Sequence, residues 1–229
     1  MKNITINISG LYGYDLISNL EVNHSENEND WSKADNILRQ ALALVSSEVK
    51  EVKSKVGVGE IAAEIVREVE VGKYDLLIIG KRPSHSFLKR LLGPTSERIM
   101  AHSPCPVLIA KGEAVPFKHI LVCSSGANGY EGPSRSVAHL APIFSGNGIT
   151  LLHVMSQISA TPDAREGWQL QASASELMEE DTPEGRLLEE RVKMLQKSGF
   201  QVSAKVRHGL VVDEILDEAQ SGNYDLAVI

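Results

Sequence analysis

The sequence predicts an α/β fold made of two tandem units, each a parallel β-sheet flanked by helices. Two observations lead to this prediction. Residues 51–79 recur without a gap as residues 201–229, and twelve of the 29 aligned pairs are identical. Each copy reads as strand, helix and strand, and the last of these is a nearly continuous apolar run, which is typical of a strand buried on both faces of a parallel sheet.

The elements of the aligned block follow from the spacing of its apolar residues. The first copy has a strand at 52–56, a glycine, and a helix whose apolar residues are Ala62, Ile65, Val66 and Val69. Gly72 then stands where a helix end favours a left-handed residue, and Gly222 does so in the second copy. Before the block, each copy has a strand, a polar stretch that we expect to be a surface loop, and an amphipathic helix. In the first copy these are residues 4–9, 21–30 and 37–49. In the second copy they are residues 149–154, 156–184 and 187–195.

Outside the aligned block the two copies differ. The first continues into a loop at 80–94, a short helix at 95–102 and a strand at 106–110, whereas the second opens with a strand at 119–123 and a helix at 134–144. The predicted units are therefore 1–112, which lacks a first strand and helix, and 117–229, which lacks the loop and last strand. Two explanations stay open: the sequence is a fragment of a longer tandem protein, or the copies exchange strands.

Composition narrows the class of protein. The chain has 229 residues, a net charge of −7, 42% hydrophobic and 23% charged residues, as expected of a globular protein. The negative charge argues against general nucleic-acid binding, and no stretch resembles a membrane span or a signal peptide, so we expect a cytoplasmic protein. Cys105 and Cys123 are expected to be buried thiols. The seven histidines show no metal-binding spacing, and the common hydrolase and P-loop signatures are missing.

Residues 74–112, YDLLIIGKRPSHSFLKRLLGPTSERIMAHSPCPVLIAKG, closely resemble the C-terminal half of a universal stress protein (UspA-like) domain. The resemblance implies a flavodoxin-like, adenine nucleotide α-hydrolase-like fold for each unit, with the first strand between the second and fourth. It also implies a glycine-containing loop that cradles the triphosphate of ATP. Gly80 and Gly93 match the first and third glycines of that loop, 13 residues apart, whereas Pro83 replaces the second glycine and Pro94 replaces a Ser or Thr.

The loop residues have a physical rationale for phosphate binding. Backbone N–H groups converge on phosphate oxygens where no Cβ blocks the approach and a helix N-terminus lies behind them. Proline supplies no donor, although Pro94 is suited to the first position of a helix. The candidate nucleotide-binding residues are Gly80, Lys81, Arg82, Gly93, Thr95, Ser96 and, in the second copy, Ser125. The alternative is a solvated loop whose apolar residues pack on a neighbouring helix or domain.

Two features bear on the ligand. Basic residues gather around the loop against one acid, Glu97, and a local positive field attracts anions; they are Lys81, Arg82, Lys89, Arg90 and Arg98. The resemblance implies an aspartate near the nucleotide after the first strand of each unit, where this chain has Ser125. A serine brings no charge for a metal ion, so magnesium-dependent binding is not expected, and no metal site is predicted.

The resemblance implies a regulatory or stress-response module that binds ATP or another adenine nucleotide through residues 80–96 and catalyses no reaction. Its expected partners are the nucleotide and a second stress-protein unit, paired within the chain or in a homodimer, with no nucleic acid and no membrane. The alternative is a degenerate module that has lost the nucleotide and serves in dimerisation or protein interaction. Pro83, Pro94 and Ser125 favour this alternative, whereas Gly80 and Gly93 favour nucleotide binding.

Overall fold

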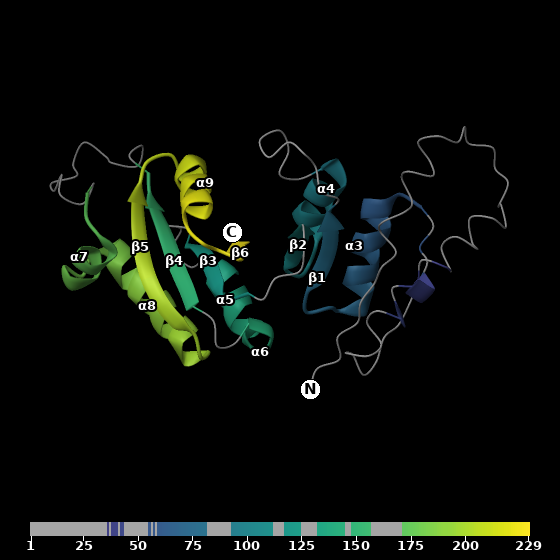
Figure 1. Ribbon diagram of the computed structural model, residues 1–229, viewed down its shortest axis with the longest axis horizontal. Helices are drawn as coiled ribbons and strands as arrows, with labels where there is room; N and C mark the ends of the chain where they lie inside the picture. The colour runs from purple at the N-terminus through teal and green to yellow at the C-terminus, as the bar shows by residue number, and fades with distance from the viewer. Residues whose placement is uncertain are drawn as a thin grey trace. The chain divides into compact units, whose positions relative to one another are not determined.

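The chain divides into two compact units, Met1–Glu113 and Ala114–Ile229 (Figure 1). A computed structural model describes residues 36, 38–40, 42–43, 55, 57, 59–81, 93–111, 117–124, 132–144, 148–156 and 171–229. The predicted strands at 4–9 and 52–56 lie wholly or mostly outside these residues. Within the predicted helix at 37–49, the described positions are helical, and Leu38 is buried.

The described part of the first unit is a strand–helix–strand segment preceded by a helix. Helix α3 spans Ile61–Gly72, β1 spans Leu77–Lys81, α4 spans Pro94–His102 and β2 spans Val107–Lys111. The two strands pair in parallel, with Leu77 opposite Val107. Between helices and sheet lies an apolar core of Ala62, Val69, Leu77 and Ile99. These elements match the predicted α/β pattern to within one or two residues.

The second unit contains a four-stranded parallel sheet. Its strands are β3 (His119–Ser124), β4 (Gly148–Met155), β5 (Gln201–His208) and β6 (Leu226–Val228), in the order β5-β4-β3-β6. The first strand of the unit therefore lies between the second and the fourth, as the family resemblance implies. Asp225 fixes this arrangement, because its carboxylate accepts the backbone N–H groups of Lys118 and His119 at 2.8 and 3.0 Å.

Helices cover this sheet, and their bounds correct two predictions. They are α5 (Gly132–His139), α6 (Ala141–Phe144), α7 (Ala174–Glu179), α8 (Pro183–Lys197) and α9 (Val211–Ser221) (Figure 1). The single helix predicted at 134–144 is interrupted at Leu140, because Pro142 cannot donate a backbone hydrogen bond within a continuous helix.

The loop predicted at 156–184 is also wrong in its last part, which holds α7 and the start of α8. Ser173 and Glu176 form a reciprocal capping box at the start of α7, a signal that the apolar spacing did not reveal. Thr182 then caps α8, accepting the N–H of Gly185 at 3.0 Å. The corner is tight, because a Cβ on Gly185 would lie 1.9 Å from the carbonyl oxygen of Leu177.

Candidate functional site

The described residues do not crowd Gly80 or Gly93, the two glycines predicted to bind phosphate. Gly80 lies near the carboxyl end of β1 and Gly93 directly precedes α4, and a Cβ added at either would meet no atom of the described residues within 4 Å. In a strand–helix–strand unit the carboxyl end of the strand and the start of the next helix lie at the same edge of the sheet, where α/β proteins bind ligands. Arg82, Pro83 and the side chain of Lys81 lie outside the described residues.

The start of α4 offers backbone donors. Pro94 is the first helical residue, as predicted, and the first N–H to bond within the helix is that of Glu97, to the carbonyl of Gly93 at 3.0 Å. The N–H groups of Thr95 and Ser96 therefore have no acceptor within the helix, and Gly93 provides no side-chain cap. An anion at this helix start would find two N–H groups and two hydroxyls.

One of the basic residues predicted to attract anions here has its charge balanced by a carboxylate. Arg98 on α4 forms an ion pair with Glu60, 3.0 Å between Nη1 and Oε2. Glu60 also accepts the N–H groups of Ala62 and Ala63 at the start of α3. Arg98 is therefore matched by a carboxylate of the same unit, while Lys89 and Arg90 lie outside the described residues.

Ser125, the remaining predicted site residue, belongs to the second unit and is outside the described residues. Its neighbour Ser124 ends β3 and is part of a buried polar group. The guanidinium of Arg191 on α8 donates to the hydroxyl of Ser124, and Nδ1 of His153 lies 3.3 Å from the Ser124 carbonyl oxygen. Arg191 and His153 are each 3% exposed, so these contacts lie inside the unit, near the carboxyl ends of β3 and β4.

Two histidines line this group. Burial lowers the pKa of His153, although its hydrogen bond to Ser124 opposes the shift, so the imidazole is neutral at pH 7. On β5, Nε2 of His208 lies 3.0 Å from the carbonyl oxygen of Ala172. Among the described residues, Nδ1 of His208 is a buried atom with no hydrogen-bond partner. Sequence reasoning assigned neither histidine to a site.

Sequence reasoning also missed Arg191, although its place between apolar residues on one face of α8 indicates that it is buried. Leu188, Arg191 and Leu195 share one face of α8 at helical spacing, and the two leucines are fully buried. A cation within an apolar stripe requires a hydrogen-bonding partner inside the protein. The partner, Ser124, is 67 residues away in sequence, so only the tertiary structure identifies it.

Several residues shared by the two copies connect helices to neighbouring segments of the chain. In the second unit, the carboxylate of Glu218 is 2% exposed. It accepts hydrogen bonds from the side chains of Lys205, Arg207 and Tyr224 at 2.7, 2.8 and 2.6 Å. Burial favours the protonated acid, but these three hydrogen bonds outweigh it and lower the pKa of Glu218 to about 2. The network joins α9 to β5 and to the turn before β6.

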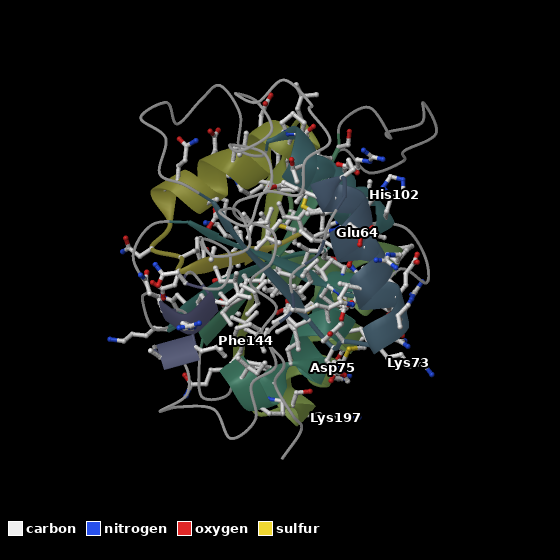
Figure 2. The ribbon with its side chains drawn as sticks, turned by 90° about the vertical axis from the view of Figure 1, so that its right-hand side faces the viewer. Glu64, Lys73, Asp75, His102, Phe144 and Lys197 are labelled. Atoms are coloured by element: carbon white, nitrogen blue, oxygen red, sulfur yellow. The ribbon has the colours of Figure 1, made fainter. Side chains whose placement is uncertain are left out.

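The first unit repeats this network with fewer partners. Glu68 on α3 accepts a hydrogen bond from the side chain of Lys55 and another from the hydroxyl of Tyr74, at 2.9 Å. The hydrogen bonds from Lys55 and Tyr74 lower the pKa of Glu68. Figure 2 shows Glu64 on the same helix and Lys73 just beyond its end. Lysine, glutamate and tyrosine are identical in the two copies, and each set joins a helix to the segments that precede and follow it.

The glycines after these helices have a different role from the predicted one. The left-handed residue after α3 is Lys73, with φ 52°, whereas Gly222 has φ −88° and neither Gly72 nor Gly222 has positive φ. The reason for glycine is close contact: a Cβ at Gly72 or Gly222 would lie 2.2 or 2.1 Å from the ring of Tyr74 or Tyr224. The glycine lets the tyrosine fold back onto its glutamate.

Comparisons with known proteins find a family match within the first unit. Residues 12–111 match the Universal stress protein family. The matched segment contains Gly80, Gly93, Thr95 and Ser96. Comparison with curated protein sequences gives no significant match.

Solved structures of universal stress proteins share the fold. One from Archaeoglobus fulgidus DSM 4304 aligns with 98% of this chain and 71% of its own, at 19% identity and a TM-score of 0.60. A proposed universal stress protein from Pseudomonas aeruginosa UCBPP-PA14 aligns with 88% of this chain and 68% of its own, at 21% identity and a TM-score of 0.56. A universal stress protein in complex with cAMP aligns with 50% of this chain and 77% of its own, at 17% identity and a TM-score of 0.36.

The described part of the chain has neither a membrane-spanning helix nor a cluster of metal-binding side chains. None of the helices there is long and apolar enough to cross a membrane. The same part of the chain contains no group of three or more histidine, cysteine, aspartate or glutamate side chains placed to hold a metal ion.

Proposed function

We propose that this chain is a tandem universal stress protein, and that it is a regulatory module that binds ATP or another adenine nucleotide without catalysing a reaction. The observation that carries the proposal is the pair Gly80 and Gly93. They stand 13 residues apart, inside the segment that matches the family, and no atom of the described residues crowds either of them. The fit to a nucleotide phosphate is partial, because Pro94 cannot donate a hydrogen bond.

In this proposal the helix start at α4 holds the phosphates. The N–H groups and hydroxyls of Thr95 and Ser96 donate to phosphate oxygens, and the positive end of the helix dipole stabilises the negative charge. Lys81 ends β1 and Arg82 is next in the sequence, and we expect both to add positive charge to the site. No acidic residue is assigned to the site, so binding is expected to be independent of magnesium.

The test is calorimetric titration of ATP, with and without magnesium, into the full chain. We expect saturable binding that Gly93→Val abolishes, because its side chain enters the space where the phosphates approach. Thr95→Ala/Ser96→Ala should weaken binding, since two hydroxyl donors are lost. Ala101→Val is the matched control, as this exposed position lies on the same helix away from its start. The absence of heat and of a thermal shift at millimolar ATP would remove the nucleotide proposal.

A second candidate function is a nucleotide-free module for dimerisation or protein interaction. It is favoured by the large apolar side chains exposed at the start of α9. Light scattering during size-exclusion chromatography tests self-association. A monomer at every concentration would remove the homodimer and leave interaction with other proteins to be examined.

A further inference from the structure

The second unit has a buried group of basic side chains near the carboxyl ends of β3 and β4. Its members meet at Ser124, whose hydroxyl accepts the guanidinium of Arg191 and whose carbonyl oxygen lies 3.3 Å from Nδ1 of His153. Arg191 and His153 are each 3% exposed. Because a carbonyl oxygen only accepts, Nδ1 carries the proton of the neutral His153 ring. A second proton on this ring would place a positive charge in the interior, close to a guanidinium that is bonded to the same residue.

Strand β5 adds a second imidazole to the same face of the sheet. His208 lies opposite Met155, two residues beyond His153 on β4, so the alternation of side chains places both rings on one face. Nε2 of His208 lies 3.0 Å from the carbonyl oxygen of Ala172 and donates to it. Its Nδ1 is buried without a hydrogen-bond partner among the described residues. The ring therefore joins the segment before α7 to β5 beneath the helices of this face.

The pKa of His153 reflects these surroundings. Burial lowers the pKa of this ring below its ordinary value of 6.5, and this is the largest effect. The hydrogen bond to Ser124 raises the pKa, and so does the carboxylate of Glu184 at the start of α8. The nearby bases Arg191 and His208 lower the pKa. In the folded unit the ring therefore resists protonation.

Other charged groups of the elements around β4 lie on its opposite face or at the surface, among the described residues. Leu152, next to His153, belongs to an apolar cluster with residues of α9, so α9 packs on the opposite face of β4. The charged residues on that face pair with one another: Lys205, Arg207, Glu214 and Glu218. The charged residues of α5, α7 and α8 other than Glu184 and Arg191 are exposed. The charge of His153 thus depends on the few groups beneath α8.

We propose that Ser124, His153, Arg191 and His208 form a pH switch that holds α8 on the sheet of the second unit and releases it on acidification. Above pH 6.5 the His153 ring is neutral whether α8 is docked or released, so docking is at its strongest. Below pH 6.5 the released ring takes a proton from solvent that the docked ring resists, and release becomes more favourable. The limit for one such group is about tenfold in the release equilibrium for each pH unit. The switch is separate from the proposed nucleotide site and does not depend on it.

Hydrogen exchange of the full chain, followed by mass spectrometry at pH 7 and pH 5.5, tests the release of α8. After correction for intrinsic exchange rates, opening of residues 183–197 should increase by more than about twofold and at most about eightfold at pH 5.5, the limit set by one proton. Residues 211–221 of α9, on the opposite face, should change less. His153→Asn retains an N–H donor for the Ser124 carbonyl but takes up no proton, so it should remove the pH dependence. His139→Asn, at an exposed position on α5, is the matched control and should retain it.

The pKa of His153, measured by NMR from its Cε1–H resonance, should move in opposite directions in two variants. Arg191→Met removes a nearby positive charge and should raise the pKa, whereas Glu184→Gln removes a negative charge and should lower it. Arg186→Met and Glu189→Gln, at exposed positions on the same helix, are the matched controls and should leave the pKa unchanged. Opposite shifts report on charge, because a loss of packing alone would not depend on the sign of the group removed.

Three results would each overturn the proposal. The first is a His153 ring that titrates at its ordinary pKa in the folded protein and responds to neither variant. The second is an α8 whose protection is the same at pH 7 and pH 5.5, or is lost no more than that of α9. The third is a pH dependence of α8 exchange that persists unchanged in His153→Asn.

Discussion

Replacing Glu218 by glutamine tests whether the buried network stabilises the second unit. The carboxylate is 2% exposed, and three donors lower its pKa from 4.5 to about 2. Because one pKa unit corresponds to about 1.4 kcal/mol, the difference of about 2.5 units corresponds to ~3 kcal/mol of folding free energy. Glutamine keeps the shape of the side chain but cannot offer a charged acceptor to Lys205 and Arg207.

The pH range follows from the direction of the shift. The folded protein holds this proton less tightly than the unfolded chain does, so the stabilisation is complete above about pH 4.5 and is lost as the pH falls toward about 2. Glu218→Gln should therefore destabilise the second unit by about 3 kcal/mol at pH 7, and by much less at pH 2.5. Comparing variant with parent at each pH removes the contribution of other titrating groups.

Hydrogen exchange followed by mass spectrometry suits this measurement, because peptides from residues 201–229 report on the second unit alone. Glu179→Gln, at an exposed position on α7, is the control and should change little at any pH. If Glu218→Gln lowered stability equally at pH 7 and pH 2.5, the loss would not come from the charge, and the reasoning about the network would be refuted.

Three further predictions concern the second unit. Gly222→Ala should destabilise it by about 2 kcal/mol, because the added Cβ would lie 2.1 Å from the ring of Tyr224; unchanged stability in urea would contradict this contact. Burial raises the pKa of Cys123 to about 11, so this thiol should react with a thiol reagent at pH 8 only after unfolding. Rapid labelling of Cys123 in the native protein would disprove its burial. Arg191→Met should lower the free energy of unfolding by about 2 kcal/mol, because it removes a buried hydrogen bond. Arg186→Met, on the exposed side of the same helix, should lower it far less. Equal losses for the two variants would show that the buried hydrogen bond of Arg191 does not stabilise the unit.

Much of the fold was predictable because it depends on local patterns. Apolar spacing predicted α3, α9 and the strands of the second unit, and the repeat predicted that two segments of the chain would adopt the same structure. The errors arose where a short-range signal was overlooked. Pro142 interrupts the helix predicted at 134–144, and the capping box at Ser173 starts a helix inside a predicted loop.

The candidate site was predictable only in part. Motif spacing selected Gly80, Gly93, Thr95 and Ser96, and the structure adds that no described atom crowds either glycine and that α4 begins at Pro94. Two other candidate residues, Arg82 and Ser125, lie outside the described part of the chain. The pairing of Arg98 with Glu60 was not predictable from the sequence, because the two residues lie on different helices and their contact depends on how those helices pack.

The sequence by itself determined the α/β class, the repeated block and the spacing of the loop glycines, because each is set by residues close together along the chain. The roles of the repeated residues were decided by the tertiary structure. Gly222 is explained by the ring of Tyr224 and not by its own backbone angles, and Glu218 is ionised because cations from β5 converge on it inside the unit. Burial and charge pairing depend on contacts between segments, and these exist only once the helices pack on the sheet.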